Sequence, residues 1–362
     1  MPDRGRYLLI DVGAGTMDVL YWDAALDIHY KAVVKSPVRR LAEEASAIEG
    51  DILITGCEMG GGALGSILRG KADSARVVMT TEAAATLHHD MGKVRSWGIE
   101  VVDTAQALER MKNPGLKRLE LADVDPERIR RLVESFGVPF AFDCVGLCAQ
   151  DHGVAPPGVS HLDFRHRLFT EILDRSPSPS ALLYRAEEVP AAMNRLKSLA
   201  ESARKLPVEE GIYVMDSGMA AILGASRDRA ARGKEKILVL DVATSHTVGA
   251  ALERDEIVGF FEYHTRDITA SNLDRLLKDL PEGRLSHEEI LREGGHGAYT
   301  RRRFPWEDTL PIIATGPKRA LLKDSRLPIV YGAPFGDNMM TGCGGLLEAI
   351  RGRQGLDPAE IV

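Results

Sequence analysis

The sequence predicts an α/β protein of more than one domain, and three observations support that fold class. Apolar strands alternate with helical segments from residue 38 to residue 92, and this alternation returns from residue 211 onward. A pattern of strand, aspartate-bearing loop and strand occurs twice, at residues 8–23 and 237–252. At 362 residues the chain is long enough for two or three domains of ordinary size.

Apolar runs and the turn residues between them predict the elements of the first half. Residues 6–12 form a buried strand and 16–23 its hairpin partner. The elements that follow are strand 27–35, helix 38–48, strand 51–56, helix 61–69, strand 75–79 and helix 81–92. From about 97 to 205 strands and helices alternate less regularly. This stretch has an amphipathic helix at 125–135, an apolar stretch at 140–148, and helices near 164–174 and 190–204.

The second half returns to regular strands. Three strands joined by short turns span 235–265, after a strand and a small-residue helix that end near residue 225. The last expected elements are helices 269–279 and 286–293, strand 311–314 and a second small-residue helix at about 336–351.

Composition narrows the class of protein. Hydrophobic residues make up 44% and charged residues 27%, with a net charge of −7, which is typical of a globular domain and gives no general reason to bind nucleic acid or a membrane. No apolar run approaches the roughly 20 residues needed to cross a bilayer, and the first residues lack the apolar segment of a signal peptide. Four cysteines do not make a disulfide framework in a chain this long. We therefore expect a cytoplasmic protein.

The first hairpin turn, Gly13–Thr16, combines glycines with a hydroxyl and presents free backbone N–H groups, which suits a phosphate. The flanking Asp11 and Asp18 cannot hold a phosphate by charge, but they can hold Mg²⁺ directly or through its waters. The two features make sense together for a metal–polyphosphate ligand. The alternative is a tight hairpin with surface carboxylates.

The second hairpin favours the metal–polyphosphate interpretation over a hairpin with surface carboxylates. It has the same arrangement of strand, turn and strand, with Asp241, Thr244, Ser245 and Thr247. Two such hairpins can clamp one phosphate chain from both sides.

Together these hairpins resemble the phosphate loops of the actin-like ATPase superfamily, which includes sugar kinases, heat-shock chaperone ATPases and 2-hydroxyacyl-CoA dehydratase activators. The superfamily pattern Asp-x-Gly-x-x-Thr is matched in the first loop by Asp11, Gly13 and Thr16. The second loop matches with Asp241 and with Ser245 to Thr247, although Ala243 replaces the usual glycine and His246 lies within the loop.

Three later segments extend this resemblance. The strand ending in Thr315, Gly316 and Pro317 is similar to the adenosine-side motif. Segments 216–225 and 336–350 resemble the two interdomain helices, whose alanines and glycines permit a close crossing. Asp216 falls where chaperone ATPases place an acidic residue near the attacking water.

The resemblance implies two actin-like (ribonuclease H-like) α/β domains around a nucleotide cleft, with an α/β insertion. The expected divisions are domain I at 1–95 with the C-terminal helix 336–362, an insertion at 96–205 for a substrate or partner, and domain II at 206–335. ATP and Mg²⁺ would bind between the hairpins, with Asp11 organising the metal. The implied nucleotide-binding residues are Gly13, Gly15, Thr16, Asp18, Ser245, His246, Thr247, Thr315, Gly316 and Pro317. The implied catalytic residues are Asp11, Asp216 and Asp241.

A closer resemblance, carried by GCEMGGG, TTEAAATLHHDM, CAQDHGVAP and PFGDNMMTGCGG, is to a bacterial and archaeal family labelled as pyruvate formate-lyase activating enzymes. Such activators hold a [4Fe–4S] cluster on Cys-x3-Cys-x2-Cys. Here Cys144 and Cys148 keep the first spacing, but Asp151 stands in the third position, so the cluster would lose one thiolate ligand. We therefore do not expect the literal activity of that label.

Two other segments are candidate sites. Cys144, Cys148, Asp151 and His152 together offer ligands for zinc or iron, while the alternative is two buried cysteines beside a capping aspartate. The glycines at 60–62 precede a helix and can bind an anion or form a flexible turn.

Three functions remain open at this point. The first is an ATPase whose domain closure drives a coupled reaction or activates a partner protein. The second is a small-molecule kinase acting on a carboxylate or hydroxy compound. The third is a nucleotide-dependent assembly protein without enzymatic activity. Fold-level analogy does not choose between them.

Overall fold

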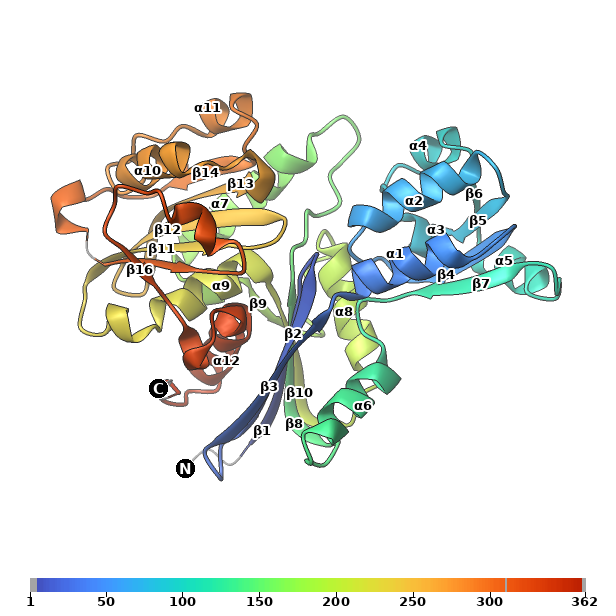
Figure 1. The fold of residues 1–362 in the computed structure, drawn as a ribbon, viewed down its shortest axis with the longest axis horizontal. Helices are drawn as coiled ribbons and strands as arrows, with labels where there is room; N and C mark the ends of the chain where they lie inside the picture. Colours follow the sequence, from blue (N-terminus) through green and yellow to red (C-terminus); the bar gives the residue numbers. More distant parts are fainter. Residues whose placement is uncertain (1–4, 310, 360–362) are drawn as a thin grey trace.

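The computed structural model describes residues 5–309 and 311–359. The outermost residues of the expected domain I, 1–4 and 360–362, lie outside the described residues. Two six-stranded sheets and one four-stranded sheet are covered by helices, which confirms the α/β class (Figure 1). None of the helices in the described ranges is both long and apolar enough to cross a bilayer.

The first sheet has the strand order β3-β2-β1-β8-β10-β9. Its strands are β1 (Arg6–Val12), β2 (Thr16–Asp23), β3 (Ile28–Lys35), β8 (Phe142–Ala149), β9 (Leu183–Arg185) and β10 (Val208–Asp216). The first three strands are antiparallel neighbours, whereas β8 and β10 run parallel to β1. The helices that follow β8 in the chain are α7 (His161–Arg175) and α8 (Asn194–Ala203).

The second sheet repeats this plan, in the order β14-β13-β12-β11-β15-β16. Its strands are β11 (Lys236–Val242), β12 (His246–Glu253), β13 (Glu256–His264), β14 (Gly297–Thr300), β15 (Ile312–Thr315) and β16 (Ile329–Tyr331), with helices α10 (Ala270–Asp279) and α11 (His287–Arg292). Three antiparallel strands again precede two parallel ones, and β1 and β11 share the same alternation of buried positions. This duplicated strand order is that of two actin-like, ribonuclease H-like domains, as expected.

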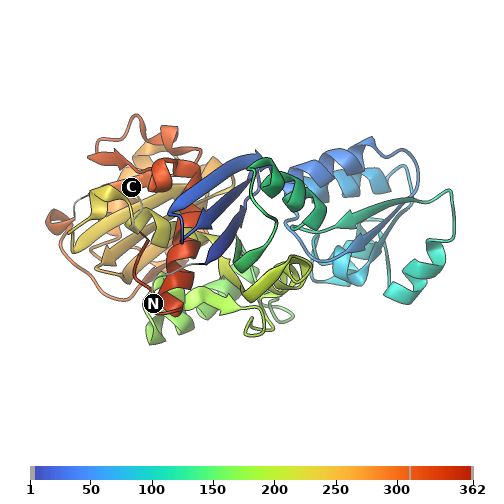
Figure 2. The same ribbon diagram turned by 90° about the horizontal axis from the view of Figure 1, so that it is seen from below.

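The third sheet is a separate unit with its own hydrophobic core, and Figure 2 shows it standing to one side of the other two. Its four parallel strands lie in the order β6-β5-β4-β7. Its elements are α1 (Pro37–Ala47), β4 (Ile52–Gly56), α2 (Gly62–Ala72), β5 (Val77–Thr80), α3 (Thr81–Ala84), α4 (Met91–Ser96), β6 (Glu100–Val102), α5 (Thr104–Arg110) and β7 (Lys117–Leu121). Helix α6 (Pro126–Ser135) then leads back to β8.

This unit, which we call the third domain (residues 37–121), corrects the expected domain divisions. A boundary at residue 95 would cut its sheet, because β6 and β7 pair with strands that precede that residue. The expected insertion 96–205 contains β8, and the expected domain II contains β10, yet both pair in the first sheet. The reason is that β8 pairs with β1, a contact between strands far apart in the sequence, which local periodicity does not reveal.

Two helices link the actin-like domains. Helix α9 (Ser217–Ser226) joins β10 of the first sheet to the second domain, and α12 (Thr341–Arg353) lies against it. A Cβ built on Gly224 would lie 1.9 Å from the carbonyl oxygen of Thr341, and one on Gly345 would lie 1.8 Å from that of Ala220. The close crossing expected from the small residues is therefore confirmed.

Candidate functional site

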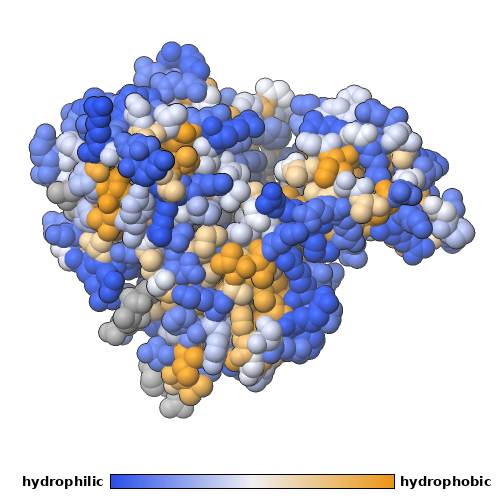
Figure 3. Space-filling view, in the orientation of Figure 1, coloured by the Kyte–Doolittle hydropathy of each residue, from blue (hydrophilic) through white to orange (hydrophobic). Residues whose placement is uncertain are grey.

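A cavity of about 790 Å³ lies where the two actin-like domains and the third domain meet. Both hairpin turns, the start of α12, the loop after β4 and the loop before α4 line it. The space-filling view shows this face of the molecule recessed between the second domain and the third domain (Figure 3). The volume falls within the range of about 300–1,000 Å³ found for small-molecule sites.

The two hairpins close in the same way. In the first, the N–H of Gly13 donates to the carbonyl oxygen of Thr16 (3.0 Å), and in the second Ala243 donates to His246 (3.1 Å). Ala243 has no positive φ, so its side chain fits a turn in which glycine is usual. The register places His246, and not Thr247, at the position of Thr16.

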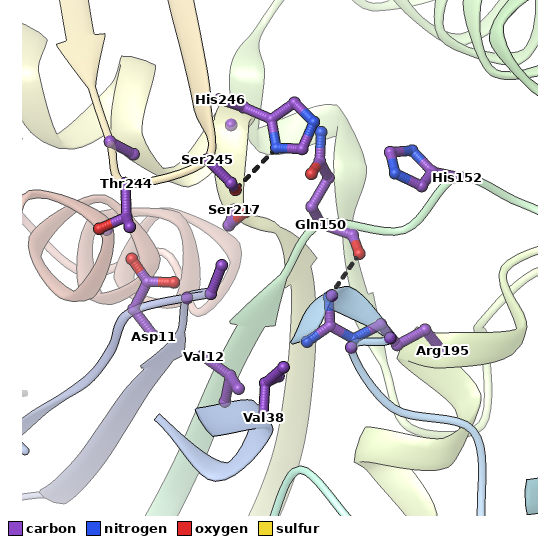
Figure 4. A pocket seen from close by; sticks show the side chains of 18 of the residues that line it. Asp11, Val12, Val38, Gln150, His152, Arg195, Ser217, Thr244, Ser245 and His246 are labelled. Atoms are coloured by element: carbon purple, nitrogen blue, oxygen red, sulfur yellow. Dashed lines mark hydrogen bonds between the residues drawn. The ribbon is translucent and has the colours of Figure 1, made fainter. Parts of the chain in front are cut away.

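Thr247 therefore does not occupy the phosphate-binding position expected for it. It is fully buried, and its hydroxyl is hydrogen bonded to that of Thr265 (3.0 Å). Of the second loop, Ala243 to His246 line the cavity instead. Figure 4 shows Thr244 near Asp11, while His246 extends from Ser245 toward Gln150 and His152.

The tips of the two hairpins touch. A Cβ built on Gly15 would lie 2.8 Å from Oγ1 of Thr244, so a larger residue at position 15 would push the hairpins apart. The start of α12 closes on the same place, because a Cβ on Gly342 would lie 2.1 Å from Oδ2 of Asp11. Glycine at both positions lets three backbone segments meet at the floor of the cavity.

Three carboxylates gather at this floor. Asp11 and Asp18 are direct partners across β1 and β2, and Asp241 is the equivalent of Asp11 in the second hairpin. Burial and neighbouring aspartates raise the pKa of Asp11 to about 7 and that of Asp18 to about 8, and burial raises that of Asp241 to about 6. Oδ1 of Asp18 is buried and has no hydrogen-bond partner within 5–309 and 311–359.

Only part of the motif expected beside adenosine lines the cavity. Gly316 and Pro317 line the cavity, and Nδ2 of Asn338 donates to the carbonyl oxygen of Gly316 (3.1 Å). Thr315 is fully buried and does not line it; its hydroxyl donates to Oδ1 of Asp241 (2.9 Å). Thr315 thus holds Asp241 in place.

The structure does not place Asp216 where it could take its expected role of orienting a water molecule. Its Oδ2 accepts a hydrogen bond from Nη1 of Arg165 (2.8 Å), and its Oδ1 accepts from the backbone of Gly218 (3.0 Å) at the start of α9. Only 1% of the residue is exposed. Both oxygens therefore accept hydrogen bonds from the protein, and Asp216 is not among the residues that line the cavity.

The expected metal set of Cys144, Cys148, Asp151 and His152 is also corrected. Cys144 and Cys148 lie on one buried strand, where four residues span about 13 Å, so they cannot share an ion. Asp151 accepts from the backbone of Gly153 (2.7 Å) and of Leu196 (3.0 Å). Only His152 faces the cavity.

Sequence reasoning placed His246 in the nucleotide site but missed that it groups with His264 and His296 beside His152. The rings of His246, His264 and His296 lie within 4.3–4.8 Å of one another, centroid to centroid. Burial lowers the pKa of His246 to about 4, so its imidazole is neutral. The register of the hairpin 246–264 carries the missed signal, since it puts two histidines side by side at its open end.

The third domain supplies the opposite wall. Oε1 of Glu58 lies 2.9 Å from Nε2 of His89, and hydrogen bonding to Glu58 raises the pKa of His89. Next to the third domain, Arg195 of α8 pairs with Asp123 (2.8 Å) and donates to the carbonyl oxygen of Gln150 (2.9 Å; Figure 4). The glycines at 60–62 line the cavity beside this ion pair, with the N–H of Gly60 directed at Asp123 (3.4 Å).

Residues 59–321 match the family described as "Putative pyruvate format-lyase activating enzyme (DUF1786)". The chain belongs to this family. Cys144 and Cys148, which keep the first spacing of the cluster motif Cys-x3-Cys-x2-Cys, lie too far apart on β8 to bind one cluster. No curated protein sequence matches the chain significantly.

Solved structures with similarity to the chain include a ROK hexokinase from Thermus thermophilus, at 12% identity and a TM-score of 0.24, over 70% of this chain and 48% of that one. The ethanolamine utilization protein EutJ from Carboxydothermus hydrogenoformans has 12% identity and a TM-score of 0.31, over 96% and 90%. An exopolyphosphatase from Cytophaga hutchinsonii has 9% identity and a TM-score of 0.29, over 86% and 66%. The chain spans about half the length of the hexokinase, and the fold assignment rests on strand order and not on these likenesses.

Proposed function

We propose that this family member binds Mg²⁺ and ATP between its hairpins and is an ATPase whose domain closure drives a coupled reaction or activates a partner protein. The observation that carries the proposal is the group of carboxylates Asp11, Asp18 and Asp241 beside two phosphate-type turns; Asp18 is buried and the other two are partly buried. Like charges directly opposite each other on a hairpin are unfavourable, and either protonation or a cation between them relieves the repulsion.

The residues fit a magnesium–polyphosphate. Asp18 Oδ1 is a buried oxygen lacking a partner in the described part of the chain, and oxygen ligands are those that Mg²⁺ prefers. Backbone N–H groups of Ala14 and Gly15, and of Thr244 and Ser245, would bind phosphate oxygens from the two sides. When bound, Mg²⁺ neutralises charge on those oxygens.

Other residues would position the nucleotide and the attacking water. Gly316 and Pro317, with Asn338 and Met339, form the wall suited to adenosine. Because Asp216 is engaged by Arg165, we assign the orientation of water to Gln150 and Ser217, which line the cavity between the hairpins.

The first test is thermal denaturation with Mg-ATP. A ligand at 100 times its dissociation constant stabilises the folded state by about 2.7 kcal/mol, so the melting temperature should rise. Asp11→Ala should abolish the rise and still fold, whereas Asp324→Ala, at an exposed position, should keep it. An unchanged melting temperature of the wild type at millimolar Mg-ATP would contradict the proposal.

A second prediction concerns pH. The pKa values of Asp11 and Asp18 are raised on folding, so between the ordinary carboxyl pKa and these values the folded state holds more protons than the unfolded state. The free energy of unfolding without Mg²⁺ should therefore fall as the pH rises from about 5 to about 8. Asp18→Asn should flatten this dependence in urea titrations, and Asp324→Asn should not; equal slopes in wild type and Asp18→Asn would refute the assignment.

A small-molecule kinase is the second candidate, and the Glu58–His89 pair favours it. A carboxylate hydrogen bonded to an imidazole in the cavity wall can accept the proton of an acceptor hydroxyl. ATP consumption that requires an added hydroxy or carboxylate compound would favour the kinase. Light scattering that grows with ATP would favour the assembly protein.

A further inference from the structure

A second group of side chains lies in the cavity, and the proposed nucleotide site does not use it. The imidazoles of His246, His264 and His296 each bring one ring nitrogen within 4.8 Å of the other two. His246 and His264 are direct partners across β12 and β13. The backbone N–H of His296 donates to the backbone carbonyl oxygen of Glu262 (2.8 Å). Three backbone segments of one sheet therefore hold the group together.

The nitrogen atoms of this group are poised for a ligand. Nδ1 of His246 is hydrogen bonded to Oγ of Ser245 (2.9 Å). Its other nitrogen, Nε2, is buried and has no hydrogen-bond partner among the residues that the structure describes. A buried polar atom normally has a partner, because burying it without one costs about 1–3 kcal/mol. The missing partner points to a ligand at this place.

We propose that His246, His264 and His296 bind one divalent transition-metal ion, with zinc as the reference metal and an open coordination position toward the cavity. Three imidazoles around one tetrahedral ion, with bonds of about 2.1 Å, have nitrogens about 3.4 Å apart. The ligand atoms here lie within 4.8 Å of one another, and small side-chain rotations can close the difference. Three protein ligands and one open position are typical of catalytic sites and not of structural ones.

The surroundings of the three rings support this assignment. Oε1 of Glu262 lies 3.6 Å from Nδ1 of His296, and Nη2 of Arg165 lies 3.4 Å from Oε2 of Glu262. A fixed carboxylate beside a ligating histidine orients the ring and raises its basicity. His152 stands next to the group, with its ring centroid 5.9 Å from that of His246.

The metal would differ from the magnesium of the nucleotide site. Imidazole nitrogen suits zinc, iron, nickel and copper, whereas Mg²⁺ takes oxygen ligands such as those of Asp11 and Asp18. The two centres can therefore be separated experimentally. The open position would accept an anionic or hydroxyl oxygen of a second substrate, which the transition metal would polarise.

The test is a titration of chelator-treated, untagged protein with Co²⁺ in the absence of nucleotide, followed by visible d–d absorption, and with Zn²⁺, followed by elemental analysis after desalting. We expect one equivalent of either ion and a higher melting temperature. His264→Ala and His296→Ala should each lose the stoichiometric binding. Asp11→Ala, which removes a magnesium ligand, and His161→Ala, on another wall of the same cavity, should both keep it.

Circular dichroism and the metal-free melting temperature of each variant establish that it is folded. Should His264→Ala not fold, His264→Gln replaces it in the same titration. Less than a tenth of an equivalent of bound metal in the wild type would overturn the proposal. An equal loss of metal binding in His161→Ala would overturn it as well. Binding that appears only when ATP is added would also overturn it, because phosphate oxygens would then be supplying ligands.

Discussion

Arg165→Ala should lower the free energy of unfolding by about 3–5 kcal/mol, the usual cost of removing one partner of a buried ion pair. The guanidinium of Arg165 lies 2.8 Å from Asp216 and 3.4 Å from Glu262, and all three residues are buried. Without it, two carboxylates stay in the interior with no compensating charge. Urea unfolding at neutral pH measures the loss.

The matched control for this substitution is on the same helix. Arg167 is exposed, so Arg167→Ala should change stability by no more than about 0.5 kcal/mol. The pH dependence separates charge from packing, since Arg165 also lies over the ring of Phe169 (4.2 Å). Uncompensated carboxylates have raised pKa values, so the deficit should shrink as the pH falls and they become protonated. A loss that does not change with pH would mean that packing, and not charge, is what Arg165 supplies.

The position of Arg165 also explains why its effect should extend beyond stability. Asp216 ends β10 of the first domain, and Glu262 belongs to β13 of the second, so one guanidinium joins the two domains beside the cavity. The Arg165 charge also lowers the pKa of Glu262 well below its ordinary value, although burial opposes this. Glu262 thus stays ionised next to His296.

Local features of the fold could be predicted from the sequence. The hairpins β1–β2 and β11–β12 follow from alternation and turn residues over a few positions, and their observed bounds agree with the expected ones. The close crossing of α9 and α12 follows from small residues on both helices. Each of these depends on neighbours in the chain, which is the information that periodicity carries.

Features that depend on distant pairing could not be predicted. The expected domain boundaries are wrong because β8 pairs with β1 across an entire inserted domain. The cysteines of β8 were grouped by their spacing, although a strand keeps them apart. The histidine group needs the register of β12 with β13 and the approach of His296, so neighbours in the sequence do not reveal it.

The helix crossing gives the second large prediction. Gly345→Ala should cost more than about 3 kcal/mol, the upper end of ordinary overpacking, because the added Cβ would lie 1.8 Å from the carbonyl oxygen of Ala220. The neighbour is backbone, so the helices must separate to make room. Since Gly342 at the start of α12 touches Asp11, the shift should also disturb the cavity floor and weaken any stabilisation by Mg-ATP.

The same substitution one position before the end of the same helix should have the opposite sign. No atom in the described ranges lies within 4 Å of a Cβ built on Gly352, so Gly352→Ala should gain helix stability of about 0.5–1 kcal/mol. Chemical denaturation of the pair therefore isolates the crossing from helix propensity, because the two variants differ only in what the new methyl group meets. If Gly345→Ala were as stable as Gly352→Ala, the contact between α9 and α12 would not hold the actin-like domains in this arrangement, and the cavity floor at Asp11 would need another support.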